Sequence, residues 1–242
     1  WAAGKNDKGQ LGIGSTNNTS VPKKVLRLKN VTDVTASWDH AMALCSDGSV
    51  WAWGNNNAEK LGSGSTNTEY TYPVRTIVLP VKPEQIAVGR DHSLALINGE
   101  VFAWGASPKH QCGLGDTSKV ILNNVTVDYT KKIKKISSSY QHSLALTEDG
   151  KVCGWGVNDN RQASAAYDWE SVYFLEMNEL NSIVDISAGG YHSVVLDANG
   201  DIWAWGKNQD GQIGNGGSGN VTTPIKLTTI SQVSQITAGY QN

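Results

Sequence analysis

The dipeptide Trp-Gly returns about every 50 residues along this 242-residue chain, and no other feature limits the possible folds so strongly. A second phrase, Gly or Ser followed by two variable residues and His, keeps the same spacing. Self-similarity at a period of about 20 to 50 residues is typical of solenoids, propellers and arrays. We therefore expect one domain, residues 1–242, made of repeated units. The units cover approximately 1–30, 31–80, 81–130, 131–181 and 182–230, with a partial unit at 231–242.

The second repeat contains three strand-length segments. Residues 31–36 alternate in polarity, and residues 41–44 and 50–53 are short apolar runs without helical stagger. Asp47-Gly48 lies between the last two, and such dipeptides favour tight hairpin turns. Proline precedes a further short segment in three repeats, and proline is tolerated at a sheet edge. These outer strands are expected at Val25, 74–77 and 225–227.

Four antiparallel strands per repeat make a sheet with two apolar faces, which is buried when such sheets stack radially. The sequence therefore predicts an all-β fold, a β-propeller of about five four-stranded blades. In the third strand of each blade the Trp of Trp-Gly alternates with small residues such as Ala52 and Ala103. We expect a bulky indole to meet a small neighbour at each junction between blades, as core packing.

Composition excludes several classes of function. The formal net charge is −2, which gives no electrostatic footprint for nucleic acid. The basic run at residues 131–135 is interpreted as a solvated strand edge. The three cysteines show no disulfide or metal-ligand spacing, and no apolar run is long enough to cross a membrane. We expect no cofactor, no nucleic acid partner and no membrane partner, and nothing in the sequence indicates a compartment.

The combined motifs resemble a known repeat family. Gly-x-x-His-Ser-Leu-Ala-Leu, Asp-Gly-x-Val-x-x-Trp-Gly and Asn-x-x-Gly-Gln-Leu-Gly at this spacing are similar to the regulator of chromosome condensation family, whose units are called RCC1-like repeats. The resemblance covers essentially the whole chain and implies a propeller, usually seven-bladed in the family. Here the count is five, so the chain forms either a closed five-unit ring or an arc of a larger propeller. An arc exposes apolar blade faces, which additional repeats or a partner would cover.

The resemblance implies several activities that share one feature, the binding of a protein on one rim of the propeller. Family members include nucleotide exchange factors, ubiquitin-ligase components, a plant ultraviolet receptor and bacterial inhibitors of enzymes. The receptor's Gly-Trp-Arg-His corners are matched here only by Trp38, which disfavours ultraviolet sensing. The constant spacing leaves no room for the inserted hairpin of the exchange factor. Fold alone selects none of these functions.

The four repeated histidines, His40, His92, His142 and His192, suggest catalysis or a metal ring at first sight. Their recurrence in every blade instead favours a structural use, in which each imidazole bonds backbone at a tight corner. No nucleophile with a base, no metal-binding helix motif and no phosphate loop is present. We therefore expect a protein that is not an enzyme, without catalytic or metal-ligating residues.

The residues just before each histidine vary between repeats, although the surrounding motif is constant. They occupy the corner between the first and second strands of each repeat, so in a propeller they fall on one rim. Exposed aromatic and Arg side chains are the types that anchor protein interfaces. The predicted partner-binding residues are Trp38, Asp39, Arg90, Asp91, Tyr140, Gln141, Tyr191 and Tyr240. Packing against the neighbouring blade is the alternative for these side chains. A second candidate patch follows the degenerate loop of the fourth repeat, at Tyr167, Asp168, Trp169 and Glu170, where sequence drift is the alternative.

These residues favour a non-catalytic scaffold that binds a protein partner on one rim. The alternative is a carbohydrate- or small-ligand-binding propeller, since rim aromatics beside Asp and Asn also suit sugar stacking. A regulator resembling a guanine-nucleotide exchange factor, or an enzyme of any kind, ranks third.

Overall fold

The computed structural model describes residues 1–113, 117–126, 130–165 and 171–242. These residues form eighteen strands in one two-stranded and four four-stranded sheets. The first sheet pairs β1 (Ala2–Gly4) with β2 (Thr19–Lys23). The second contains β3 (Val31–Ala36), β4 (His40–Cys45), β5 (Val50–Asn55) and β6 (Glu69–Arg75), and the third β7 (Gln85–Val88), β8 (His92–Ile97), β9 (Glu100–Ser107) and β10 (Thr117–Asn124). The fourth contains β11 (Ile133–Ser138), β12 (His142–Thr147), β13 (Val152–Val157) and β14 (Ser171–Met177), and the fifth β15 (Ile183–Ala188), β16 (His192–Asp197), β17 (Ile202–Gly206) and β18 (Val221–Lys226). A 3-10 turn, η1 (Asn57–Glu59), follows β5.

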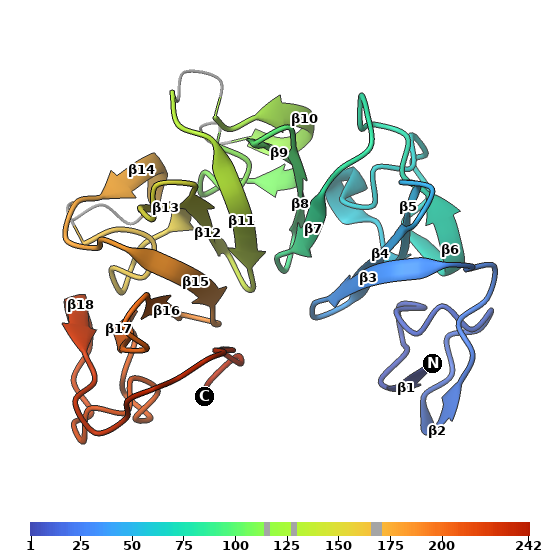
Figure 1. Ribbon diagram of the computed structural model, residues 1–242. Coiled ribbons are helices and arrows are strands. Elements are labelled where there is room, and N and C mark those ends of the chain that lie inside the picture. The colour runs from blue at the N-terminus through green and yellow to red at the C-terminus, as the bar shows by residue number, and fades with distance from the viewer. Residues whose placement is uncertain (114–116, 127–129, 166–170) are drawn as a thin grey trace.

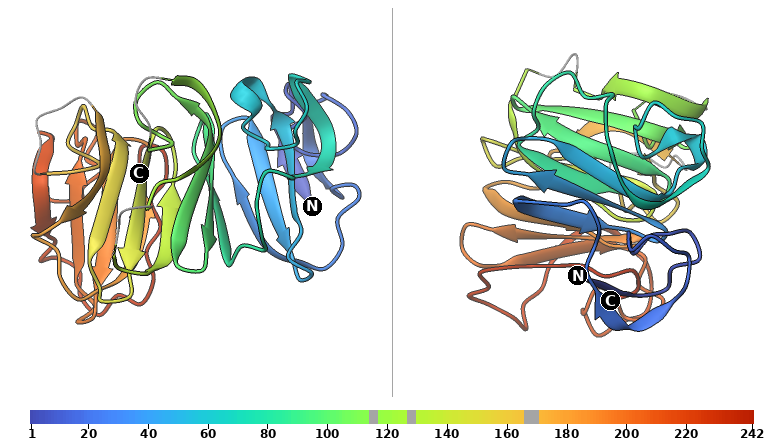
Figure 2. Two further views of the ribbon diagram at one scale, coloured as in Figure 1. Left: turned by 90° about the horizontal axis from the view of Figure 1, so that it is seen from above. Right: turned by 90° about the vertical axis from the view of Figure 1, so that its right-hand side faces the viewer.

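Each four-stranded sheet is an antiparallel meander, and the five sheets fan around a common axis (Figure 1). The first strand of each meander, such as β3 or β11, lies nearest the axis. Figure 1 shows that the arc is open between the blue β1–β2 end and the red β18 end, and Figure 2 shows the same stack of sheets from two other sides. Residues 231–242 run beside β15, where the Ala238 amide donates to Ser187 Oγ at 2.8 Å. Of the two arrangements left open by the sequence, the structure has the open arc.

The outer strands differ from their predicted positions. β6 begins at Glu69 and contains Pro73, whereas the sequence predicted a strand at 74–77 after that proline. β2 and β18 likewise contain Pro22 and Pro224. The prediction was wrong by several residues because an outer strand is paired on one side alone. Proline, which has no N–H, is therefore accepted within the strand and does not mark its beginning.

The tryptophans of the Trp-Gly phrase join consecutive sheets, as predicted. All four are buried, and Trp104 packs with Ala52 and Leu61 of the preceding repeat. Their indole nitrogens also donate across each junction, over 2.8 to 3.1 Å, to main-chain oxygens of the preceding loop. The four pairs are Trp53 with Gln10, Trp104 with Lys60, Trp155 with Gln111 and Trp205 with Gln162.

The glycine of the Trp-Gly phrase is required by a close approach between the third strand and the corner that joins the first two strands. Gly54 has a φ of +97°, and a Cβ built there would lie 2.3 Å from the main-chain oxygen of Asp39. The following amide, that of Asn55, donates to the same oxygen at 2.8 Å. The phrase therefore holds the corner against the rest of its sheet, and these corners carry the predicted site.

Candidate functional site

Four aromatic side chains from separate parts of the chain meet on the rim formed by the corners between the first and second strands. We call Trp38, Tyr140, Tyr191 and Tyr240 the corner cluster. Trp38 precedes β4, Tyr140 precedes β12, Tyr191 precedes β16 and Tyr240 lies in the C-terminal segment. Sequence equivalence predicted that these residues share a rim, and the structure adds that their rings touch.

The rings pack at tilted and edge-on angles. The ring centroid of Tyr140 lies 4.9 Å from that of Tyr191 and 5.4 Å from that of Tyr240. Trp38 comes from the second sheet, yet its ring centroid lies 5.8 Å from that of Tyr240. Trp38 is 57% exposed and Tyr240 is 38% exposed. The cluster is thus a preassembled aromatic surface with two large side chains still open to solvent.

Two cations border the cluster. The Arg90 guanidinium lies 5.0 Å from the Tyr140 ring centroid and donates to the Tyr140 hydroxyl. The Lys207 ammonium lies 5.7 Å from the Tyr191 ring centroid. Burial, together with hydrogen bonds to the Tyr240 and Tyr140 hydroxyls, raises the pKa of Tyr191. Tyr191 is therefore neutral at pH 7. Both cations at the edge of the cluster are also ion-paired, Arg90 with Asp91 at 3.5 Å and Lys207 with Asp210 at 3.4 Å.

The acidic members of the predicted site point inward. Asp39 and Asp91 both contact the ammonium of Lys60, a fully buried side chain that the sequence analysis did not single out. Gln141 contributes its main-chain oxygen, which accepts from the Val157 amide at 2.9 Å. A signal for Lys60 existed in the sequence, because the equivalent position in the other repeats is glutamine.

The four repeated histidines are buried, and His40, His92 and His142 bond the next sheet through side chains. The Nε2 atoms of His40, His92 and His142 lie 3.2, 3.0 and 2.9 Å from the hydroxyls of Ser93, Ser143 and Ser193. The expectation of a main-chain partner was wrong for this nitrogen, because the imidazole crosses the junction between sheets. Burial lowers the pKa of His92 and His142 to about 3, so these rings are neutral at pH 7. Among the described residues no group of three or more His, Cys, Asp or Glu side chains could hold a metal ion.

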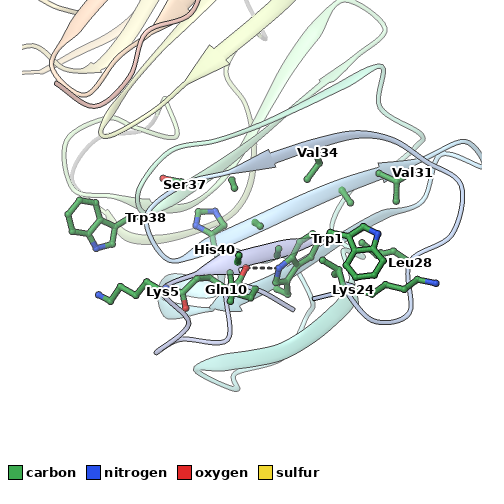
Figure 3. A pocket seen from close by; sticks show the side chains of 18 residues that line it. Trp1, Lys5, Gln10, Lys24, Leu28, Val31, Val34, Ser37, Trp38 and His40 are labelled. Carbon is green, nitrogen blue, oxygen red and sulfur yellow. Dashed lines mark hydrogen bonds between the residues drawn. The ribbon is translucent and has the colours of Figure 1, made fainter. Parts of the chain in front are cut away.

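Two hollows border the site. One, of about 440 Å³, lies at the axis beneath the corner cluster and is lined by hydroxyls that include those of Ser37, Ser137 and Ser187. The other, of about 660 Å³, lies between the first sheet and the strands β3, which is largely exposed, and β4, which is buried (Figure 3). Figure 3 shows Trp1 and Val34 at this second hollow, and both side chains are exposed. The apolar blade face expected for an arc is thus present, and its cover by further repeats or a partner stays a prediction.

The remaining sequence candidates do not join the corner cluster. In the basic run, Lys131 pairs with Asp149 at 3.0 Å and Lys135 pairs with Asp185. The second candidate patch, Tyr167, Asp168, Trp169 and Glu170, lies outside the described residues. Within the part of the chain that the structure describes, no helix has the length and apolar character needed to cross a membrane.

Comparisons with known proteins agree on one family and one fold. The family model of the RCC1-like domain matches residues 1–242. The chain is 32% identical to the ultraviolet-B receptor UVR8 of Arabidopsis thaliana over 160 residues, which are 64% of this chain and 36% of that protein. It is 34% identical to the human probable E3 ubiquitin-protein ligase HERC6 over 176 residues, 69% of this chain and 17% of that protein. The chain therefore spans about a third or less of the length of these relatives.

Two solved structures share the arrangement of sheets. Prp20p from Saccharomyces cerevisiae superposes with a TM-score of 0.80 at 20% identity, over 99% of this chain and 59% of that one. Human WBSCR16 superposes with a TM-score of 0.81 at 20% identity, over 98% of this chain and 64% of that one. At such identity the likeness establishes the β-propeller fold alone.

Proposed function

The chain belongs to the RCC1-like domain family, and from this membership we propose that it is a non-catalytic scaffold that binds a protein partner through the corner cluster. The observation that carries the proposal is the convergence of Trp38 and three tyrosines on one rim, with Arg90 beside them. Trp, Tyr and Arg are the residues most enriched among binding hot spots. Prp20p, whose fold this chain shares, has binding properties to Gsp1p and histones, and Kap60 binds yeast RCC1.

The geometry favours a surface ready for binding. Ring contacts within the cluster and the Arg90 contact to Tyr140 hold side chains in place before a partner arrives. A preorganised surface loses less side-chain entropy on association, so more of the contact energy appears as affinity. The exposed faces of Trp38 and Tyr240 then supply the apolar area that a partner buries.

The test compares the intact protein with a Trp38→Ala/Tyr140→Ala variant. A partner is isolated from the source organism with the parent protein, purified, and its dissociation constant is measured for each variant. We expect the double substitution to weaken binding by on the order of 100-fold or more, because two hot-spot side chains are removed. Tyr173→Ala is the control, since Tyr173 is an exposed aromatic residue on the outer strand β14. An unchanged dissociation constant in the double variant rejects the proposal.

A carbohydrate or another small polar ligand is the second candidate. The hollow of about 440 Å³ supports it, because hydroxyls such as those of Ser137 and Ser187 line it next to the Trp38 and Tyr140 rings. Aromatic faces beside hydrogen-bonding groups also suit the stacking of sugars. A glycan array that binds the parent protein, and not the Trp38→Ala variant, while no protein partner is recovered, favours this candidate.

A further inference from the structure

Lys60 stands where the other four repeats carry glutamine, at Gln10, Gln111, Gln162 and Gln212. Each glutamine closes its own loop by accepting, over 2.8 to 3.0 Å, a hydrogen bond from the backbone N–H two residues earlier. An ammonium group only donates, so Lys60 cannot close its loop in this way. The preceding residues form η1 instead, in which Ala58 has a φ of +57°.

The Lys60 side chain crosses from the second sheet to the third. Its Nζ donates to Asp39 Oδ1 at 2.9 Å in the second sheet, and to Asp91 Oδ1 at 3.3 Å and the Arg90 main-chain oxygen at 3.1 Å in the third. The side chain is 0% exposed. Its three protons therefore have three acceptors, as a buried ammonium requires. We call Asp39, Lys60 and Asp91 the lysine bridge.

Three departures from the repeat coincide in the lysine bridge. Lys60 replaces glutamine, and Asp39 and Asp91 stand where later repeats have Gln141 and Tyr191. Lys60 without the two aspartates would be a fully buried charge that lacks its carboxylate partners, which is strongly unfavourable. Asp91 is 35% exposed and also pairs with Arg90 at 3.5 Å, and Asp39 also accepts from Asn55. Together the changes compensate one another, which indicates that the three residues act as one unit.

The lysine bridge connects the two corners that carry Trp38 and Arg90. Trp38 directly precedes Asp39, and Arg90 directly precedes Asp91. The Arg90 carbonyl accepts from Lys60, while the Arg90 amide donates to the Tyr140 main-chain oxygen at 2.7 Å. A continuous path of bonds therefore leads from the second sheet, through Arg90, to the tyrosines of the corner cluster.

We propose that the lysine bridge positions the Trp38 and Arg90 corners so that the corner cluster is assembled before a partner binds. This inference rests on the proposed function of the cluster. Lys60 is a positioning residue in this scheme: it lies beneath the rim, touches no partner, and acts through the two corners. The hydrogen bond from the amide after Trp-Gly to the corner oxygen recurs in each four-stranded sheet, as between the Lys207 amide and the Tyr191 main-chain oxygen at 2.8 Å, so the lysine bridge is an additional contact at the Trp38 and Arg90 corners.

The experiment uses Lys60→Gln, which installs the residue of the other repeats. Hydrogen exchange is followed on the free protein at the amides of Arg90 and Asn55, which bond to Tyr140 and Asp39, with the Lys207 amide as the reference within the same molecule. We expect exchange at Arg90 and Asn55 to accelerate at least about tenfold, with Lys207 unchanged, because loss of the bridge lets these corners open locally. The nuclear Overhauser contact between the Trp38 and Tyr240 rings should disappear as well. Gln162→Met is the control, because it removes the loop-closing side chain of a junction whose corners carry Gln141 and Tyr191 in place of aspartates. In this control, exchange at Arg90 and Asn55 and the ring contact should stay parental.

A second variant separates positioning from simple charge balance. Adding Asp39→Asn and Asp91→Asn to Lys60→Gln removes the two negative charges that Lys60 balanced. We expect the ring contact to stay absent in this triple variant, and a partner to dissociate at least about tenfold faster than from the parent protein. Recovery of the ring contact in this triple variant overturns the proposal, as does parental exchange at Arg90 in Lys60→Gln. Hydrogen exchange is measured without a partner, so it tests the positioning role independently of partner binding. Whether a partner binds through the corner cluster is tested separately by the Trp38→Ala/Tyr140→Ala variant.

Discussion

Replacing Trp155 by phenylalanine tests whether the indole bonds between sheets stabilise the arc. Trp155 is 0% exposed, and its Nε1 donates to the Gln111 main-chain oxygen of the preceding sheet at 2.9 Å. The smaller ring gives up about 50 Å² of buried apolar surface, which contributes about 1 kcal/mol at 25 cal/mol per Å². A buried carbonyl that loses its donor costs about 1 to 3 kcal/mol more. We expect Trp155→Phe to lower the free energy of unfolding by about 2 to 4 kcal/mol.

Two matched variants make the test specific. Trp51→Phe removes an indole that is half-buried and bonds to Ser49 within its own hairpin, at 3.0 Å, so we expect a loss below about 1 kcal/mol. We expect Trp104→Phe to lower the free energy of unfolding by an intermediate amount. The Lys60 main-chain oxygen loses the Trp104 indole as a donor, but it still accepts from the Ser93 hydroxyl at 2.7 Å.

The assay is urea-induced unfolding of the intact protein, followed by the near-ultraviolet circular dichroism of the aromatic side chains. With a slope of about 2 kcal/mol per M, the Trp155→Phe midpoint should fall by at least about 1 M. Midpoints of the Trp155→Phe and Trp51→Phe variants that agree within about 0.2 M would refute the reasoning, because the bond between sheets would then contribute no more than a bond within a hairpin.

Two further predictions concern the corner that carries Trp38. Gly54→Ala should lower the free energy of unfolding by more than about 2 kcal/mol in the same urea assay, because the new Cβ would lie 2.3 Å from the Asp39 main-chain oxygen at a φ of +97°. Gly211→Ala is the control: its φ is +79° but nothing lies within 4 Å of the new Cβ, so the loss should be about 1 kcal/mol. Burial alone raises the pKa of Asp39, but contacts with His40 and Lys60 lower it to a net value of about 2, from 3.8. Because the pKa of Asp39 is lower in the folded than in the unfolded protein, its carboxylate stabilises the fold at pH values above the unfolded pKa, and this stabilisation is lost as the pH falls. After allowance for solvent screening, the free energy of unfolding should decrease by about 1 to 2 kcal/mol between about pH 4 and 2. A pH titration of stability in which Asp39→Asn keeps the parental slope over that interval would contradict this assignment.

Much of the frame could be predicted from the sequence because the same local interactions recur in every repeat. The strands at 31–36, 41–44 and 50–53, and the burial of the Trp-Gly tryptophans, follow from polarity patterns and spacing. The outer strands were misplaced because proline was interpreted as a boundary. The histidine partner was also missed, because a serine one repeat later is adjacent in space and not in sequence.

The candidate site could be predicted only as a set of equivalent positions. Equivalence placed Trp38, Tyr140, Tyr191 and Tyr240 on one rim, but contact across the axis depends on the curvature of the arc. Asp39 and Asp91 were expected to face a partner. Their contact with Lys60 could not be predicted, because alignment of the repeats does not show which side chains of neighbouring repeats lie within bonding distance.

The sequence by itself determined the repeated unit, its strands and the junctions between sheets, because each depends on a period that every copy shares. The tertiary structure alone decided the open arc, the aromatic contact between the second sheet and the C-terminal segment, and the buried lysine between two aspartates. Those features arise where copies differ from one another, and a buried charge or a ring contact depends on which of the differing side chains the fold brings within a few ångströms.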